Sequence, residues 1–175
     1  MDPEDRKGLK RNIMKYLIAA ICILPTLSFA QDAAYDTDAL VTCIDVQDDP
    51  TEAQSCIGQA LEVCLNADEA NTTASMRACI AGEVAFWDEM LNSEYQRLRQ
   101  DAKAVDAAGG ADAPSLADAL QQMQRAWIAY RDASCAYVGL SYGTGTLGGT
   151  LAYDCVMHET GKQALRLKFE DILFE

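Results

Sequence analysis

Hydrophobic residues recur at helical spacing over two long stretches of the chain. In the first, successive members are 4, 4, 3, 4, 4 and 3 residues apart, in the order Met76, Ile80, Val84, Trp87, Leu91, Tyr95 and Leu98. This spacing places one apolar side chain on the same helix face at every turn. The pattern ends before Gly109 and Gly110, so we predict a long helix over about residues 73–106, with Thr72 or Thr73 as its cap.

The second stretch has intervals of 4, 3, 4, 3, 4 and 4 residues, in the order Leu116, Leu120, Met123, Trp127, Tyr130, Ser134 and Val138. It predicts an amphipathic helix over about residues 115–138. Because the link around Pro114 is short, the two helices should be antiparallel. Trp127 and Tyr130 are expected in the core, and Arg131 is expected to pair with an acid or to bond carbonyl groups.

Shorter patterns flank this pair. A brief apolar-periodic stretch covers residues 38–46, and a second helix should start at Pro50 and run to about Leu65. The segment 139–150 holds five glycines and three threonines, which predicts a loop, and a last helical pattern follows Cys155. No stretch shows strand-type alternation. The expected fold is all-α, a small disulfide-stapled bundle with two long antiparallel helices.

The N-terminus has the features of a secretory signal peptide over residues 1–30. A basic segment precedes an apolar run of fourteen residues from Tyr16, and small residues Ser28 and Ala30 stand where a signal peptidase cleaves. The mature domain would then cover residues 31–175. An uncleaved anchor is the alternative, and Met14 is an alternative start. We expect a periplasmic or secreted bacterial protein without membrane attachment after cleavage.

Six cysteines remain beyond residue 30, an even number that indicates disulfides in an exported chain. Six cysteines allow fifteen pairings. Neighbouring cysteines flank the three predicted connections, which favours the pairs Cys43–Cys56, Cys64–Cys79 and Cys135–Cys155. The C-x-x-C spacing of redox and zinc-ribbon motifs does not occur.

Charge and composition exclude several functions. Acids outnumber bases 27 to 14, and removal of residues 1–30 changes the net charge from -13 to -15, which argues against nucleic-acid binding. His158 is the only histidine, and no G-x-S-x-G, H-E-x-x-H or P-loop motif is present. The acids, Glu83 among them, are dispersed and typical of a solvated face. We therefore predict no catalytic residues, no metal and no cofactor.

We expect the protein to bind another protein. The glycine-rich segment, pinned between Cys135 and Cys155, could present a shaped loop to such a partner; a plain connector is the alternative. The candidate contact residues are Ser141, Tyr142, Gly143, Thr144, Gly148, Gly149 and Thr150.

The run from Gln124 to Cys135 resembles the signature of a bacterial envelope family, the lysozyme-inhibitor LprI-type N-terminal domain. The resemblance covers about residues 64–170, and its signature positions here are Trp87, Tyr95, Trp127, Tyr130, Arg131 and Asp132. Where the family often carries Arg, this chain has Gln163. The resemblance implies a secreted helical domain without catalytic residues, and one branch of the family is associated with inhibiting lysozyme. Together with the excess of acids and the loop between Cys135 and Cys155, it favours a binding protein that inhibits a basic lysozyme-type hydrolase. A non-inhibitory envelope interaction protein is the alternative.

Overall fold

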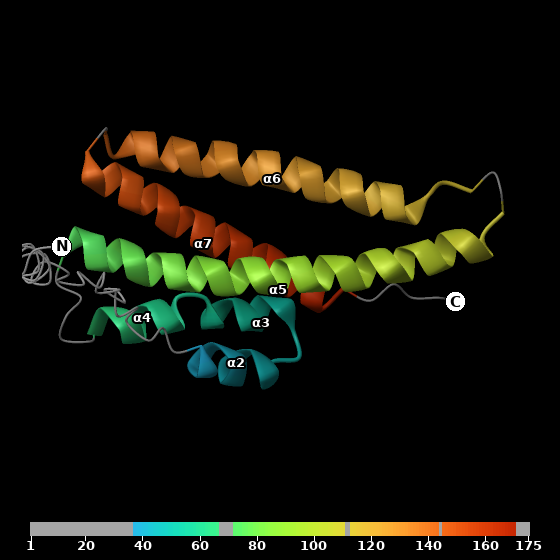
Figure 1. Ribbon diagram of the computed structural model, residues 1–175, viewed down its shortest axis with the longest axis horizontal. Coiled ribbons are helices and arrows are strands. Elements are labelled where there is room, and N and C mark those ends of the chain that lie inside the picture. The colour runs from blue at the N-terminus through green and yellow to red at the C-terminus, as the bar shows by residue number, and fades with distance from the viewer. Residues whose placement is uncertain (1–36, 67–71, 111–112, 144, 171–175) are drawn as a thin grey trace, which may run out of the picture. The chain divides into compact units, whose positions relative to one another are not determined.

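The computed structural model describes residues 37–66, 72–110, 113–143 and 145–170. The predicted signal peptide, residues 1–30, lies outside the described residues and stays a prediction. Helices make up most of the described part of the chain, and it contains no strand (Figure 1), which confirms the all-α fold. Its elements are α2 (Asp38–Asp45), α3 (Pro50–Ala53), the 3-10 turn η1 (Gln54–Cys56), α4 (Gln59–Asn66), α5 (Thr73–Ala108), α6 (Leu116–Ser141) and α7 (Thr146–Lys168).

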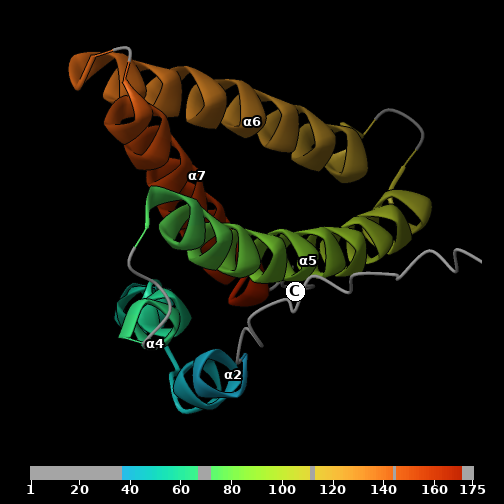
Figure 2. The ribbon, with the colours of Figure 1, turned by 60° about the vertical axis from the view of Figure 1, so that its left-hand side comes forward.

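The two long helices α5 and α6 run antiparallel, as predicted (Figure 1). The third long helix, α7, makes the most extensive contacts in the domain, first with α5 and then with α6. Figure 2 shows α7 leaving the end of α6 and crossing toward α5. The contact between α5 and α6 is smaller. Therefore α6 packs against the domain through a narrow face.

This arrangement corrects the prediction that Tyr130 belongs to the core. Tyr130 is exposed, as is Leu116, and Trp127 is half-buried. The residues that α6 buries are smaller or polar: Ala117, Gln124, Cys135 and Gly139. The helical spacing was right, but the helix presents only part of its apolar side to the rest of the domain.

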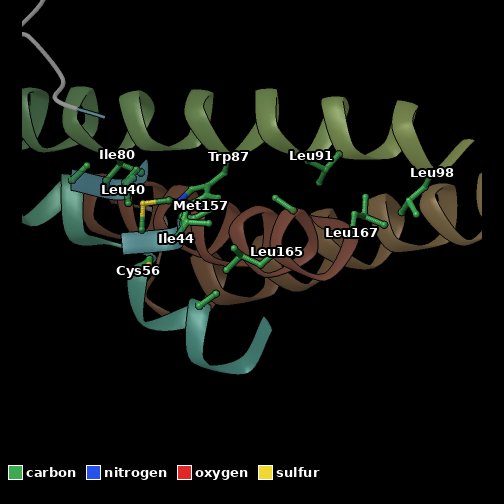
Figure 3. Packing of buried hydrophobic residues seen from close by; sticks show 13 residues of the cluster. Leu40, Ile44, Cys56, Ile80, Trp87, Leu91, Leu98, Met157, Leu165 and Leu167 are labelled. Atoms are coloured by element: carbon green, nitrogen blue, oxygen red, sulfur yellow. The ribbon is translucent and has the colours of Figure 1, made fainter. Parts of the chain in front are cut away.

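The main core lies between the N-terminal helices, α5 and α7 (Figure 3). Helix α5 contributes Ile80, Trp87, Leu91 and Leu98, and α7 contributes Met157, Leu165 and Leu167, while Leu40, Ile44 and Cys56 come from the N-terminal helices. Burial of such large apolar side chains is the dominant stabilising term, about 1.5–3 kcal/mol for each. Helix α6 adds only half-buried side chains to this cluster, among them Trp127.

The N-terminal segment contains one more break than the sequence predicted. Instead of one helix from Pro50 to Leu65, α3 and η1 end at Cys56, and α4 starts at Gln59. Gly58 between them has φ of +97°, a left-handed conformation that favours glycine. Asp49 caps α3 by accepting from the backbone N–H groups of Thr51 and Glu52 at 2.7 and 3.2 Å.

The three predicted disulfides are confirmed. Cys43–Cys56, Cys64–Cys79 and Cys135–Cys155 have Cα–Cα distances of 5.8, 5.7 and 5.4 Å. The bridges close segments with sequence separations of 13, 15 and 20 residues. They join α2 to η1, with α3 between them, α4 to α5, and α6 to α7. Cross-links of this length typically stabilise by about 2–4 kcal/mol, largely by restricting the unfolded chain.

The predicted loop over residues 139–150 is much shorter than expected. Helix α6 continues to Ser141 and α7 begins at Thr146, nine residues before Cys155. Two of the glycines serve close packing between these helices: Gly139 and Gly148 are buried, and a Cβ on Gly148 would clash with the carbonyl oxygens of Gly139 and Gly143. The glycine-rich segment therefore contains a close contact between α6 and α7, at Gly139 and Gly148, as well as the turn between the two helices.

The ends of the long helices are capped by side chains. Thr72 and Ser75 form a reciprocal capping box at the start of α5, in agreement with the prediction. At the start of α6, the carboxylate of Asp106 accepts from the backbone N–H groups of Leu116 and Ala117 at 2.7 and 3.1 Å, and from the hydroxyl of Ser115 at 2.8 Å. The last turn of α5 is thereby tied to the first turn of α6.

Asp106 should make stability depend on pH. The hydrogen bond from the Leu116 N–H, with those from Ser115 and Ala117, holds the pKa of Asp106 below its ordinary value of 3.8. A lowered pKa contributes stability above the unfolded-state pKa, and that contribution is lost as the pH falls through the folded-state pKa. Asp106→Asn should therefore be less stable than wild type near neutral pH, with a deficit that shrinks below pH 3.8.

Urea unfolding of both proteins between about pH 3 and 7 measures this deficit. A deficit of equal size at every pH would contradict a role for the carboxylate charge.

Candidate functional site

Three of the six signature residues meet in one groove between α5 and α6. Tyr95 comes from α5, and Trp127 and Arg131 come from α6. The groove has a volume of 270 Å³ and is otherwise lined by Asp88, Leu91, Asn92, Gln121, Gln124, Arg125 and Ile128. It lies where the two long helices have their limited contact.

Arg131 is held in place by three neighbours. Its guanidinium lies 5.0 Å from the centre of the Trp127 ring, a cation–π arrangement. Its Nε and Nη2 atoms donate to Oδ1 of Asp132 at 2.9 and 2.8 Å, and Nη1 donates to Oγ1 of Thr160 at 3.4 Å. The prediction that Arg131 pairs with an acid is confirmed. Because Thr160 belongs to α7, Arg131 also links α6 to α7.

Trp87, another signature residue, lies in the core and not in the groove. It is fully buried, and its indole Nε1 donates to Oε1 of Glu83 at 2.9 Å. Glu83 is also fully buried and accepts from the backbone N–H groups of Gly58 at 2.5 Å and Leu61 at 2.7 Å. Glu83, which lies in α5, thus provides the hydrogen-bond acceptor for two backbone N–H groups at the start of α4.

The expectation that Glu83 belongs to a solvated acidic face is therefore wrong. A signal was present in the sequence, since Glu83 and Trp87 stand four residues apart on the apolar side of the predicted helix. What the sequence could not supply was the partner, because the two amide groups lie more than twenty residues away.

The candidate loop residues separate into two groups. Ser141, Tyr142, Gly143 and Gly149 are exposed, and Thr144 lies outside the described residues. Gly148 and Thr150 are buried, and the Thr150 hydroxyl donates to the carbonyl of Thr146 at 3.0 Å. Gly148 and Thr150 therefore serve the packing of α7.

Gln163, where the sequence departs from the family that it resembles, is buried between α6 and α7. Its Nε2 donates to Oε1 of the buried Gln124 at 3.1 Å. A neutral amide pair thus occupies this position, and Gln124 also lines the groove.

His158 interacts with Asp154 of its own helix, α7. Its Nδ1 lies 3.1 Å from the carbonyl oxygen of Asp154, and the side chain is 43% exposed. Among residues 37–66, 72–110, 113–143 and 145–170, no group of three or more His, Cys, Asp and Glu side chains is arranged to hold a metal ion. Within the same ranges, none of the helices has the length and apolar content needed to cross a membrane.

Together these features define a class of protein: a small helical scaffold that three disulfides cross-link. Of its signature residues, Trp87 is buried in the core and Arg131 links α6 to α7. The chain belongs to the lysozyme inhibitor LprI family, whose model matches residues 64–167. The match spans more than half of the chain and includes α5, α6 and nearly all of α7. The family resemblance found in the sequence is thereby confirmed.

One curated relative is an uncharacterized protein of Rhizobium meliloti (strain 1021). It is 30% identical over 96 residues, which make up 53% of this chain and 69% of the relative. No solved structure matches this chain.

Proposed function

We propose that this protein is an exported inhibitor that binds a lysozyme-type cell-wall hydrolase and has no catalytic activity of its own. The observation that carries the proposal is the match to the lysozyme inhibitor LprI family over residues 64–167. The matched region contains the long helices and two of the three disulfides, Cys64–Cys79 and Cys135–Cys155. An inhibitor of this kind requires a stable surface, and the stapled bundle supports that requirement.

The charge of the chain supports a basic partner. The net charge is -13 for the full chain and -15 without residues 1–30. Active lysozymes are commonly cationic, so opposite charge would accelerate their encounter with this protein. Charge contributes more to the association rate than to the affinity, and salt screens it. Specific inhibition must therefore persist at physiological ionic strength.

A turbidity assay tests the proposal. The purified mature protein is added to egg-white lysozyme and to a bacterial muramidase acting on cell-wall suspensions, at low and at physiological salt. We expect inhibition of at least one enzyme with a dissociation constant of about 1 μM or below at physiological salt.

Loss of inhibition on raising the salt alone would show nonspecific attraction between opposite charges. No inhibition at either salt concentration would instead favour an envelope interaction protein with a different partner.

A further inference from the structure

We propose that the exposed side of α6, the turn that follows it and the first turn of α7 form the surface that contacts the hydrolase. The surface consists of Tyr130, Tyr137, Leu140, Tyr142 and Leu147, and we call it the tyrosine surface. This inference rests on the proposed function and deepens it by naming the contact residues.

The first observation is a concentration of exposed apolar side chains. The exposed fractions of Tyr130, Tyr137, Leu140, Tyr142 and Leu147 are 62, 74, 72, 60 and 59%. Eleven large hydrophobic side chains are exposed in the described part of the chain, and with Ile128 six of them lie within residues 128–147. Single exposed apolar residues are ordinary, but a cluster marks an interaction site.

The second observation is their alignment on the helix. Tyr137 follows Tyr130 by seven residues, and Leu140 follows Tyr137 by three, so the three side chains lie along one side of α6. The buried residues of α6, Gln124, Cys135 and Gly139, occupy other positions of the helix and face the domain. The packing of the domain therefore leaves the tyrosine surface uncovered.

The charge around this surface selects the partner. No Lys or Arg occurs from Asp132 to Gly161, whereas this segment contains Asp132, Asp154 and Glu159. Arg131 beside Tyr130 is paired with Asp132, and Arg77 lies near Gly149, while the chain as a whole carries a net charge of -13. An aromatic surface on a strongly acidic chain suits a protein rich in Lys and Arg, because tyrosine rings attract cations and their hydroxyls form hydrogen bonds at wet interfaces. A cationic hydrolase has this chemistry, whereas an acidic protein or nucleic acid does not.

The third observation is that the two helices that carry the surface are cross-linked. The Cys135–Cys155 disulfide and the close approach of Gly139 to Gly148 connect α6 to α7. Tyrosine has few rotatable bonds and loses little conformational entropy on binding. A preorganised surface of this type retains more of its contact energy as affinity.

The test compares two double variants in the inhibition assay at physiological salt. Tyr137→Ala with Leu140→Ala removes the centre of the tyrosine surface. Val46→Ala with Val63→Ala is the matched control, because these residues are exposed apolar side chains on the N-terminal segment. We expect the first variant to weaken inhibition of egg-white lysozyme or the muramidase at least tenfold, since central aromatic anchors dominate interfaces. The control should stay within about twofold of wild type.

Circular dichroism and thermal unfolding verify that both variants fold. If wild type inhibits and the first variant inhibits equally well, the tyrosine surface is refuted while the proposed function stands. If wild type does not inhibit, the proposed function fails and the inference fails with it. Sedimentation velocity adds a further outcome: concentration-dependent self-association of wild type that the first variant abolishes would assign the surface to a second copy of this chain and overturn the inference.

Discussion

Replacing Glu83 by alanine is expected to lower the free energy of unfolding by about 3 kcal/mol or more. The two carboxyl oxygens accept three N–H groups, from Gly58, Leu61 and the indole of Trp87. Alanine would leave these donors without their acceptor, one of them in the core. An unsatisfied buried donor costs about 1–3 kcal/mol, and the lost side-chain volume adds a cavity.

Two further variants make this result specific. Glu83→Gln keeps the shape, and its single carbonyl oxygen can still accept from Gly58 and Trp87, which both bond Oε1. Its amide group would then oppose the Leu61 N–H, so we expect a smaller loss of about 1–2 kcal/mol. Glu89→Ala, at an exposed site of the same helix, is the control and should be nearly neutral. Urea unfolding gives all three values, and equal stabilities of Glu83→Ala and Glu89→Ala would refute the anchoring role of Glu83.

The second large effect is expected at Gly148, where an added methyl group should cost about 2–3 kcal/mol. The Cβ of Gly148→Ala would overlap the backbone carbonyl oxygens of Gly139 and Gly143. Backbone atoms cannot move aside as the end of a flexible side chain can, so α6 and α7 would have to separate. The Cys135–Cys155 bridge limits that separation.

Gly149→Ala is a matched control one residue away. Gly149 is exposed, and within the described residues an added Cβ would have the Arg77 guanidinium as its neighbour, at 4.0 Å. Alanine in a helix is favoured over glycine by about 0.5–1 kcal/mol, so this variant should be neutral or slightly more stable. Thermal unfolding of the pair gives shifts of opposite sign if the crossing requires Gly148. Shifts of the same size and sign would contradict the close-packing account.

The sequence predicted the long helices well because their signal is local and repeated. Ile80, Trp87, Leu91 and Leu98 recur at helical spacing and are all buried. The disulfides were predictable for a related reason. The paired cysteines are separated by 13, 15 and 20 residues, so short connections bring them together.

The candidate site was predictable only in part. The signature residues Tyr95, Trp127 and Arg131 meet in the groove between α5 and α6. The resemblance to a family identified all three as signature residues, but the spacing of residues within a single helix could not show that they line one groove. Tyr130 belongs to the same helical pattern as the half-buried Met123 and Trp127 and is nevertheless exposed.

By itself, therefore, the sequence determined the helical class, the extent of α5 and the excess of acid over base, and it favoured the cysteine pairing that the structure has. The tertiary structure decided which side of each helix is covered. Helix α7 takes most of the contact with α5, which leaves the tyrosine surface of α6 exposed. The tertiary structure also decided that Glu83 is a buried hydrogen-bond acceptor and that α6 and α7 are in contact at Gly148. These outcomes depend on atoms brought together from distant or non-adjacent positions, whereas periodicity reports only what one segment offers for burial.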